Sequence, residues 1–207
     1  MDLVIVGDVH SRANALAQAL VDIGPNASKV VFIGDILDGR HWDKETTEAQ
    51  KTEEDLSTLA LVLATIDKGA KLVAGNHDIN LTLKPAKTSA RLSDKLVFKK
   101  FLNLAIKADT FLSLKSGHKT YHIAHANPFA NATKEAQVFG EKLEGQRVRW
   151  YLQQRTWPEN VVKVSGHYHN IIVEETLVVL DGDSKAEECL PVLYVSNGVH
   201  YIKKYYN

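Results

Sequence analysis

Residues 3–10 read LVIVGDVH, an apolar run that stops at a glycine and continues into an aspartate and a histidine. Short runs rich in Val and Ile, bounded by glycine or polar residues, are typical of buried strands. The same arrangement recurs along the chain, so that strand after strand is followed by Asp, Asn or His. The other segments of this kind are 30–38 (VVFIGDILD), 72–78 (LVAGNHD), 121–127 (YHIAHAN) and 161–169 (VVKVSGHYH).

Helical patterns separate these strands. Helices are predicted over Ala13–Ile23, Leu56–Ile66, Arg91–Ala108 and Lys134–Gln154, and further strands over Thr176–Leu180 and Val192–Val195. A capping signal at residues 52–55 precedes the second helix. Residues 39–51 are polar and aperiodic, and we expect a loop beside a site there. The alternation predicts an α/β layered fold with helices on the sheet faces, in one domain over residues 1–207.

The composition excludes several classes of function. The chain has 207 residues, with 25 Lys and Arg against 25 Asp and Glu, so its formal net charge is zero. Proteins that bind nucleic acid or anionic membranes usually carry a basic excess, so neither partner is expected. Cys189 is the one cysteine, which fits a reducing compartment. Residues 1–8 lack a signal-peptide pattern, and residues 56–66 are too short to span a bilayer, so we expect a cytoplasmic protein.

The strand ends carry residues that bind metal ions. Ligands bind at the carboxyl ends of strands in an open α/β sheet, so side chains distant in sequence would meet at one rim. Asp, Asn and His suit divalent ions such as Mn, Fe, Zn, Co or Ni. Each ending alone would be ordinary turn chemistry, whereas the set in this order indicates a metal site. The candidate ligands are Asp8, His10, Asp35, Asn76, His125, His167 and His169, too many for one ion and suited to two.

These motifs resemble those of the calcineurin-like metallophosphoesterase superfamily: GDxH, GDxxDxG, GNH(E/D), a lone histidine after a strand, and GHxH. The resemblance runs from residue 3 to about residue 169. It implies a four-layered α-β-β-α sandwich with two metal ions at the carboxyl-terminal ends of the strands. The chain is similar to small bacterial and phage enzymes of the phosphoprotein-phosphatase branch, which also includes dinucleoside tetraphosphatases.

The chain departs from that branch in two places. The branch usually reads Asp-Arg-Gly where this chain has Asp38-Gly39-Arg40, so the phosphate-gripping arginine is missing from its expected position, and Arg40, one residue later, is the candidate to replace it. His169 adds a second histidine to the last motif, as in the wider superfamily, which includes diesterases.

Chemistry and resemblance together imply the roles of the ligands. One ion would take Asp8, His10, Asp35 and His169, and the other Asp35, Asn76, His125 and His167. Asp35 is then the shared bridge between the ions. A hydroxide that bridges two cations would attack phosphorus in line.

His77 is not a predicted ligand, but it follows Asn76 directly. We expect it beside the leaving oxygen as a general acid, oriented by Asp38, whose charge would raise its pKa. The alternative is that His77 only braces the turn. Arginines are the expected phosphate ligands. The candidates are Arg12, Arg40, Arg147, Arg149 and Arg155, with Arg40 and Arg149 taken as the substrate-binding residues.

The residues therefore predict a metal-dependent phosphoesterase that hydrolyses phosphate monoesters, with phosphoproteins among the candidate substrates and manganese as the first candidate metal. The alternative within this chemistry is a phosphodiesterase or dinucleoside polyphosphate hydrolase. A scaffold that had lost its metals would lack ligands, and none is missing. A third class is a module that binds phosphate without turning it over.

Overall fold

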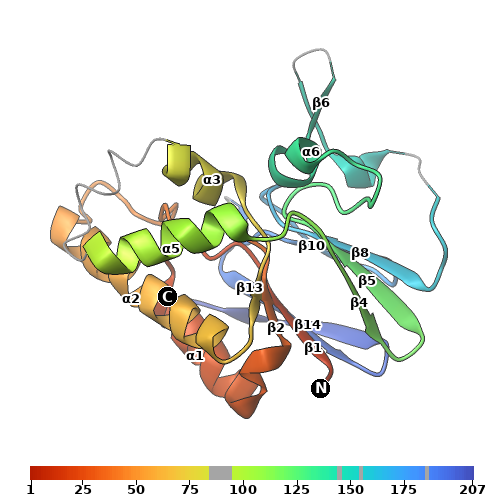
Figure 1. Ribbon diagram of the computed structural model, residues 1–207, viewed down its shortest axis with the longest axis horizontal. Coiled ribbons are helices and arrows are strands. Elements are labelled where there is room, and N and C mark those ends of the chain that lie inside the picture. Colours follow the sequence, from red (N-terminus) through yellow and green to blue (C-terminus); the bar gives the residue numbers. More distant parts are fainter. Residues whose placement is uncertain (84–94, 144–145, 154–155, 185–186) are drawn as a thin grey trace.

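The computed structural model describes residues 1–83, 95–143, 146–153, 156–184 and 187–207. Two five-stranded sheets pack against each other (Figure 1). The first has the order β14 (Val199–Tyr205), β13 (Leu190–Ser196), β1 (Leu3–Val6), β2 (Val30–Phe32), β3 (Lys71–Leu72). The second has the order β4 (Leu112–Ser116), β5 (Lys119–Ile123), β8 (Val161–Ser165), β10 (Leu177–Leu180), β9 (Ile171–Val173).

Parallel pairing brings the predicted strand ends to one level in each sheet. β1, β2 and β3 run parallel, with Val6 opposite Phe32 and Phe32 opposite Leu72. In the second sheet β5, β8 and β10 run parallel, with Ile123 opposite Val164. The segments that follow these strands therefore leave each sheet at the same edge, as expected for a ligand site in such sheets.

Most of the helices lie over the outer face of the first sheet (Figure 1). The helices are α1 (Ala13–Ile23), α2 (Glu48–Asp67), α3 (Asn76–Leu83), α5 (Lys95–Lys107) and α6 (Lys134–Phe139), with 3₁₀ turns η1 (Gly24–Lys29) and η2 (Trp150–Leu152). Two small hairpins are formed by β6 (Glu141–Leu143) with β7 (Gln146–Val148), and by β11 (Asp183–Ser184) with β12 (Glu187–Glu188).

In Figure 1, α1, α2 and α5 lie on the left over one face of the first sheet, and α6 lies at the upper right, near the second sheet. Within the described ranges, no helix combines the length and the apolar character needed to cross a bilayer.

The alternation of side chains along β1 divides the core into layers. Val4 and Val6 pack among the helices, and Leu3 and Ile5 pack against the second sheet. Because both faces of β1 are covered, the strand is apolar throughout. A third cluster around Trp150 covers the outer face of the second sheet. The predicted α/β fold with four α-β-β-α layers is confirmed, although the fourth layer is thin and built largely from η2 and neighbouring loops.

The second helix begins earlier than predicted. α2 starts at Glu48, inside the segment expected to be a loop, because Thr47 and Gln50 form a capping box. The Thr47 side chain accepts a bond from the Gln50 N–H at 3.3 Å, and Gln50 Oε1 accepts one from the Thr47 N–H at 2.8 Å. The acidic stretch 52–55 therefore lies within the helix rather than at its start.

The predicted helix over Lys134–Gln154 is wrong. α6 ends at Phe139, because Gly140 takes a positive φ of 76° and its N–H bonds to the Ala136 carbonyl at 3.0 Å. The β6–β7 hairpin and η2 follow, so Arg149 does not lie on a long helix. For the helix expected over 91–108, residues 95–107 form α5, and residues 91–94 lie outside the described part of the chain.

Candidate metal centre

The strand ends turn through backbone conformations that residues other than glycine rarely adopt. φ is positive at His10 (45°), Asp35 (48°) and His167 (71°). Asp38 (73°) and His169 (51°) share this conformation. Each such residue costs of order 1–3 kcal/mol and persists only where the surrounding structure enforces it. The strain is concentrated at the residues that the sequence predicts to be functional.

Two glycines let the strand ends approach each other closely. A Cβ atom on Gly75 would collide with Asp35, and one on Gly166 would collide with the Asp8 carboxylate. The backbone N–H of His167 instead donates to Asp8 Oδ2 at 2.8 Å. The absence of side chains at these glycines therefore allows both carboxylates to reach the centre of the site.

The buried acidic and imidazole groups form two overlapping clusters. In each cluster, one ligand atom per residue lies within 4.8 Å of the others. The clusters are Asp8, His10 and Asp35, and Asp35, His125 and His167. Asp35 Oδ2 belongs to both, at 3.8 Å from His10 Nε2 and 3.4 Å from His125 Nε2.

Asn76, at the start of α3, joins the second cluster. Its Oδ1 lies 3.0 Å from His125 Nε2 and 2.7 Å from His167 Nδ1. Amide oxygen, carboxylate oxygen and imidazole nitrogen thus converge there. All the predicted ligands except His169 meet in this way.

The orientation of the imidazoles fits a metal ion. His125 Nδ1 lies 2.8 Å from the Ile33 carbonyl oxygen, and His10 Nδ1 lies 3.0 Å from the Asp38 carbonyl oxygen. A carbonyl oxygen only accepts, so both rings carry a proton on Nδ1. The Nε2 lone pairs then point at the Asp35 carboxylate, an arrangement that repels unless a proton or a cation lies between them.

The electrostatics of the site also favour a bound cation. Burial, followed by Asp181, raises the pKa of Asp8 well above its usual range. Burial lowers the pKa of His125, but Asp35 and Asp8 outweigh it and raise that pKa to about 10. Asp8 Oδ1 is buried, and among the described residues no group donates a hydrogen bond to it. The site thus attracts positive charge strongly, and its donor set is the one that divalent transition ions prefer.

Asp78 ties two of the strand ends together. Its Oδ2 accepts the N–H of Asp35 and the N–H of Gly75, both at 3.0 Å, and its Oδ1 accepts the N–H of Ile36 at 2.9 Å. Burial, followed by Asp35, raises the pKa of Asp78 to about 6. It braces the turns after β2 and β3.

His77 lies beside the shared carboxylate and is held by Asp38. Its Nδ1 donates to Asp38 Oδ2 at 2.6 Å, and its Nε2 lies 3.9 Å from Asp35 Oδ2. Burial lowers the pKa of His77, but the hydrogen bond to Asp38 and the charge of Asp35 raise it above its usual value overall. The ring edge that carries Nε2 faces Asp35 Oδ2 and the Arg40 guanidinium.

His169 lies apart from both clusters. Its Nδ1 is 3.6 Å from Asp181 Oδ2 and 3.5 Å from Asp183 Oδ2, and its side chain is 43% exposed. The backbone N–H of His169 donates to Asp181 at 2.7 Å. Neither aspartate was among the predicted site residues. Asp181 directly follows β10, so the rule that found the other strand ends applies to it as well, and Asp183 begins β11 two residues later.

The family follows from the comparison with known proteins. The model of the calcineurin-like phosphoesterase family matches residues 1–202. The chain belongs to the calcineurin-like phosphoesterases. The family depends on metal ions, in agreement with the clusters described above.

Solved structures show the same fold for this calcineurin-like phosphoesterase. A provisionally assigned diadenosine tetraphosphatase matches with a TM-score of 0.65 and 17% identity, covering 99% of this chain and 94% of that chain. A protein serine/threonine phosphatase from Saccharomyces cerevisiae, with similarity to human phosphatase PP5, matches with a TM-score of 0.61 and 13% identity, covering 99% and 80%. No curated protein matches the sequence.

The candidate arginines of this calcineurin-like phosphoesterase occupy different places. Arg40 reaches the site, because its NH2 group lies 2.5 Å from His77 Nε2. Arg149 is exposed just before η2, and within the described residues it makes no hydrogen bond or ion pair with the predicted site. Arg12 is buried, with 1% exposure. Arg40 stands one residue later than the arginine of the family pattern, but its guanidinium still lies next to His77.

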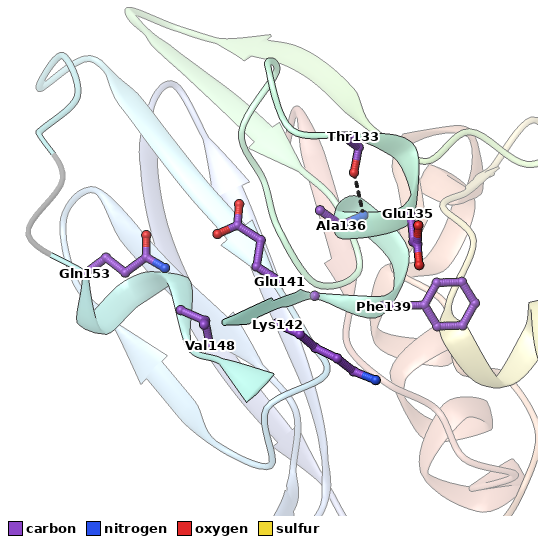
Figure 2. Close-up of a pocket in the computed structure, with 9 residues that line it drawn as sticks. Thr133, Glu135, Ala136, Phe139, Glu141, Lys142, Val148 and Gln153 are labelled. Carbon is purple, nitrogen blue, oxygen red and sulfur yellow. Dashed lines mark hydrogen bonds between the residues drawn. The ribbon is translucent and has the colours of Figure 1, made fainter. Parts of the chain in front are cut away.

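Figure 2 shows the residues that line a cavity of about 880 Å³ beside the second sheet. α6 and the β6–β7 hairpin line it, with Phe139 and Lys142 among its residues. Gly140 connects it to the site, since a Cβ there would lie 3.6 Å from His167 Nε2.

Proposed function

We propose that residues 1–207 act as one metallophosphoesterase domain that hydrolyses phosphate monoesters, with phosphoproteins among its candidate substrates. The observation that carries the proposal is the pair of buried clusters that share Asp35. Two divalent ions a few ångströms apart are a recurring device for the hydrolysis of phosphate esters. The single buried Cys189 is compatible with the cytoplasmic location that we propose.

The ligands divide between two ions. The proposed ligands of the first ion are Asp8, His10, Asp35 and His169, and those of the second are Asp35, Asn76, His125 and His167. Manganese is the proposed metal, and Fe, Zn, Ni or Co suit the same donor set. Such ions would supply an activated water as nucleophile and would neutralise the phosphoryl oxygens.

His77 is the proposed general acid. Asp38 holds its Nδ1 proton, which leaves Nε2 to give a proton to the departing oxygen. Asp38 and Asp35 favour the protonated ring that this step requires. Arg40, next to Nε2, is the proposed ligand of a phosphoryl oxygen. Arg149, the exposed residue before η2, is the second proposed substrate-binding residue.

A phosphodiester or a dinucleoside polyphosphate is the alternative substrate. The observations that favour it are the half-exposed His169 at the rim and the fold shared with the provisionally assigned diadenosine tetraphosphatase. In that case His77 would protonate the departing oxygen of an alkoxide or of a nucleotide phosphate.

Hydrolysis of matched esters tests the proposal. Metal-stripped protein would be supplied with Mn²⁺ and assayed with p-nitrophenyl phosphate, bis-p-nitrophenyl phosphate and diadenosine tetraphosphate. Preferential turnover of the monoester, lost in Asp35→Asn, is the expected result. Preference for the diester or the dinucleotide would support the alternative, and no turnover of any of them with any of the candidate metals would contradict the proposed activity.

A further inference from the structure

Arg12 is a charged residue in an interior position. Its side chain is 1% exposed and is among the largest fully buried side chains of the protein. NH2 lies 3.4 Å from Asp183 Oδ1, and NH1 has no hydrogen-bond partner among the described residues. Burying a guanidinium is costly unless a carboxylate compensates its charge, and Asp183 is the compensating group here.

The other oxygen of Asp183 faces the catalytic site. Asp183 Oδ2 lies 3.9 Å from Arg40 NH1 and 3.5 Å from His169 Nδ1. Arg40 therefore lies between Asp183 on one side and His77 on the other. The backbone of Asp183 is itself fixed, because its N–H donates to Asp181 Oδ1 at 3.1 Å.

We propose that Asp183 is the positioning residue for Arg40, and that the buried Arg12 keeps this arrangement positively charged. An ion pair of Arg40 with Asp183 alone would be neutral and would attract a phosphate weakly. With Arg12 on the opposite oxygen, two guanidiniums share one carboxylate, and the group retains one positive charge for the phosphate. The inference rests on the proposed function, in which Arg40 binds a phosphoryl oxygen.

Positioning is needed because Arg40 is partly exposed. Its side chain is 37% exposed, and a long side chain in that environment loses rotamer freedom when it binds a ligand. Holding the guanidinium next to His77 before the substrate arrives reduces that loss. The expected effect is on substrate affinity rather than on the chemical step.

A double-mutant cycle tests this link. The variants are Asp183→Asn, Arg40→Ala and the two combined, with Asp67→Asn, which breaks the surface pair with Lys100, as the matched control. Asp183→Asn is expected to raise the KM for p-nitrophenyl phosphate and the inhibition constant of inorganic phosphate by about fivefold, with kcat changed by less than about twofold. In the Arg40→Ala background the same substitution is expected to change neither constant.

Two further measurements keep the test decisive. Asp183→Asn also removes the ion pair of Arg12, so Arg12→Met/Asp183→Asn is measured beside it and is expected to show a rise in KM at least as large, because it also lacks the charge of Arg12. Manganese content and melting temperature are recorded for every variant. A rise in KM that persists without Arg40, or no rise in any variant that keeps its fold and metal, would overturn the inference.

The failure of the proposed function can be told apart from the failure of this inference. If the wild-type protein turns over none of the esters, calorimetric binding of inorganic phosphate to the manganese-loaded protein replaces the kinetic constants. Weaker phosphate binding in Asp183→Asn, absent in the Arg40→Ala background, would then still support the link. Equal binding by the wild-type protein and Asp183→Asn would overturn it.

Discussion

His122 and His125 lie close together in the chain but in surroundings of opposite electrostatic character. His125 faces the carboxylates of Asp35 and Asp8, and its pKa is raised to about 10. His122 Nδ1 lies 2.9 Å from Lys163 Nζ, and burial together with that cation lowers its pKa. A histidine becomes a candidate metal ligand when acceptors surround it, and a neutral hydrogen-bond partner when a cation does.

Lys163 makes the contrast sharper because it is a buried cation that forms no ion pair with a carboxylate of the described ranges. Its side chain donates to the Pro128 carbonyl at 3.2 Å and lies 4.5 Å above the Phe129 ring. Burial lowers its pKa to about 8. We call the group of His122, Pro128, Phe129 and Lys163 the lysine cluster.

The largest expected effect is confined to the metal centre. Asp35→Asn removes the carboxylate charge that both ligand clusters share, so kcat/KM for p-nitrophenyl phosphate should fall by at least about a thousandfold. Elemental analysis should show metal content falling with it. The control Asp67→Asn, an exposed acid, should keep both. Full metal content and full activity in Asp35→Asn would contradict a metal centre built on Asp35.

The next effect separates proton transfer from metal binding within the site. His77→Asn should keep its metal but lose about 10²–10³ in kcat for an alkyl phosphate, whose leaving group needs a proton. The loss should be smaller for p-nitrophenyl phosphate, because p-nitrophenolate leaves without help. Steady-state kinetics with both esters measures the difference. An equal loss for both would show that His77 only braces its turn.

The two regions should respond to pH in opposite directions when metal is removed. The raised pKa of His125 means that its stabilising contribution is complete below pH 6.5 and is lost as the pH rises toward 10. The lowered pKa of Lys163 means that its buried charge destabilises the folded state fully below pH 8. This destabilisation is relieved as the pH rises from there toward 10.5.

Urea unfolding at a series of pH values, in the presence of a chelator, measures how the free energy of unfolding changes with pH for each region. The difference in free energy of unfolding between the wild-type protein and His125→Asn should fall between pH 6.5 and pH 9. The difference between the wild-type protein and Lys163→Met should rise between pH 8 and pH 10. Slopes of the same sign would contradict the opposed charge environments.

The smallest expected effect is that of the lysine cluster on activity. Lys163→Met removes the bond to Pro128, which follows His125 in the same loop, but leaves every ligand in place. Metal content should be unchanged, and kcat/KM should fall by less than about threefold, as measured with p-nitrophenyl phosphate. A loss as large as that of Asp35→Asn would mean that the two regions form one functional unit.

The sequence was sufficient to predict that the ends of neighbouring parallel strands meet. Parallel strands share a carboxyl edge, so Asp8 and Asp35, which follow β1 and β2, had to approach each other. His167 follows β8 of the second sheet, and the packing of the two sheets brings it to them. The rule does not give the orientation of a side chain at that edge. His169 leaves its turn toward Asp181 and Asp183 instead of the clusters, which only the three-dimensional structure shows.

Other features could not be predicted because they depend on tertiary contacts. The Lys134–Gln154 segment has a helical composition, but the positive φ at Gly140 ends α6 and a hairpin follows. Arg12 and Asp183 are far apart in sequence, and their pairing has no local signal. Arg40 shows the reverse case, since a position that departs from the family pattern still brings its guanidinium to His77.

Manganese binding tests the central claim most directly, namely that Asp35 joins two metal positions. Equilibrium dialysis of metal-stripped protein should give two Mn²⁺ ions per chain, and electron paramagnetic resonance should show the spectrum of an exchange-coupled pair. Asp35→Asn should abolish the coupled spectrum. One ion per chain with an uncoupled spectrum, or a coupled spectrum that survives in Asp35→Asn, would contradict a shared Asp35.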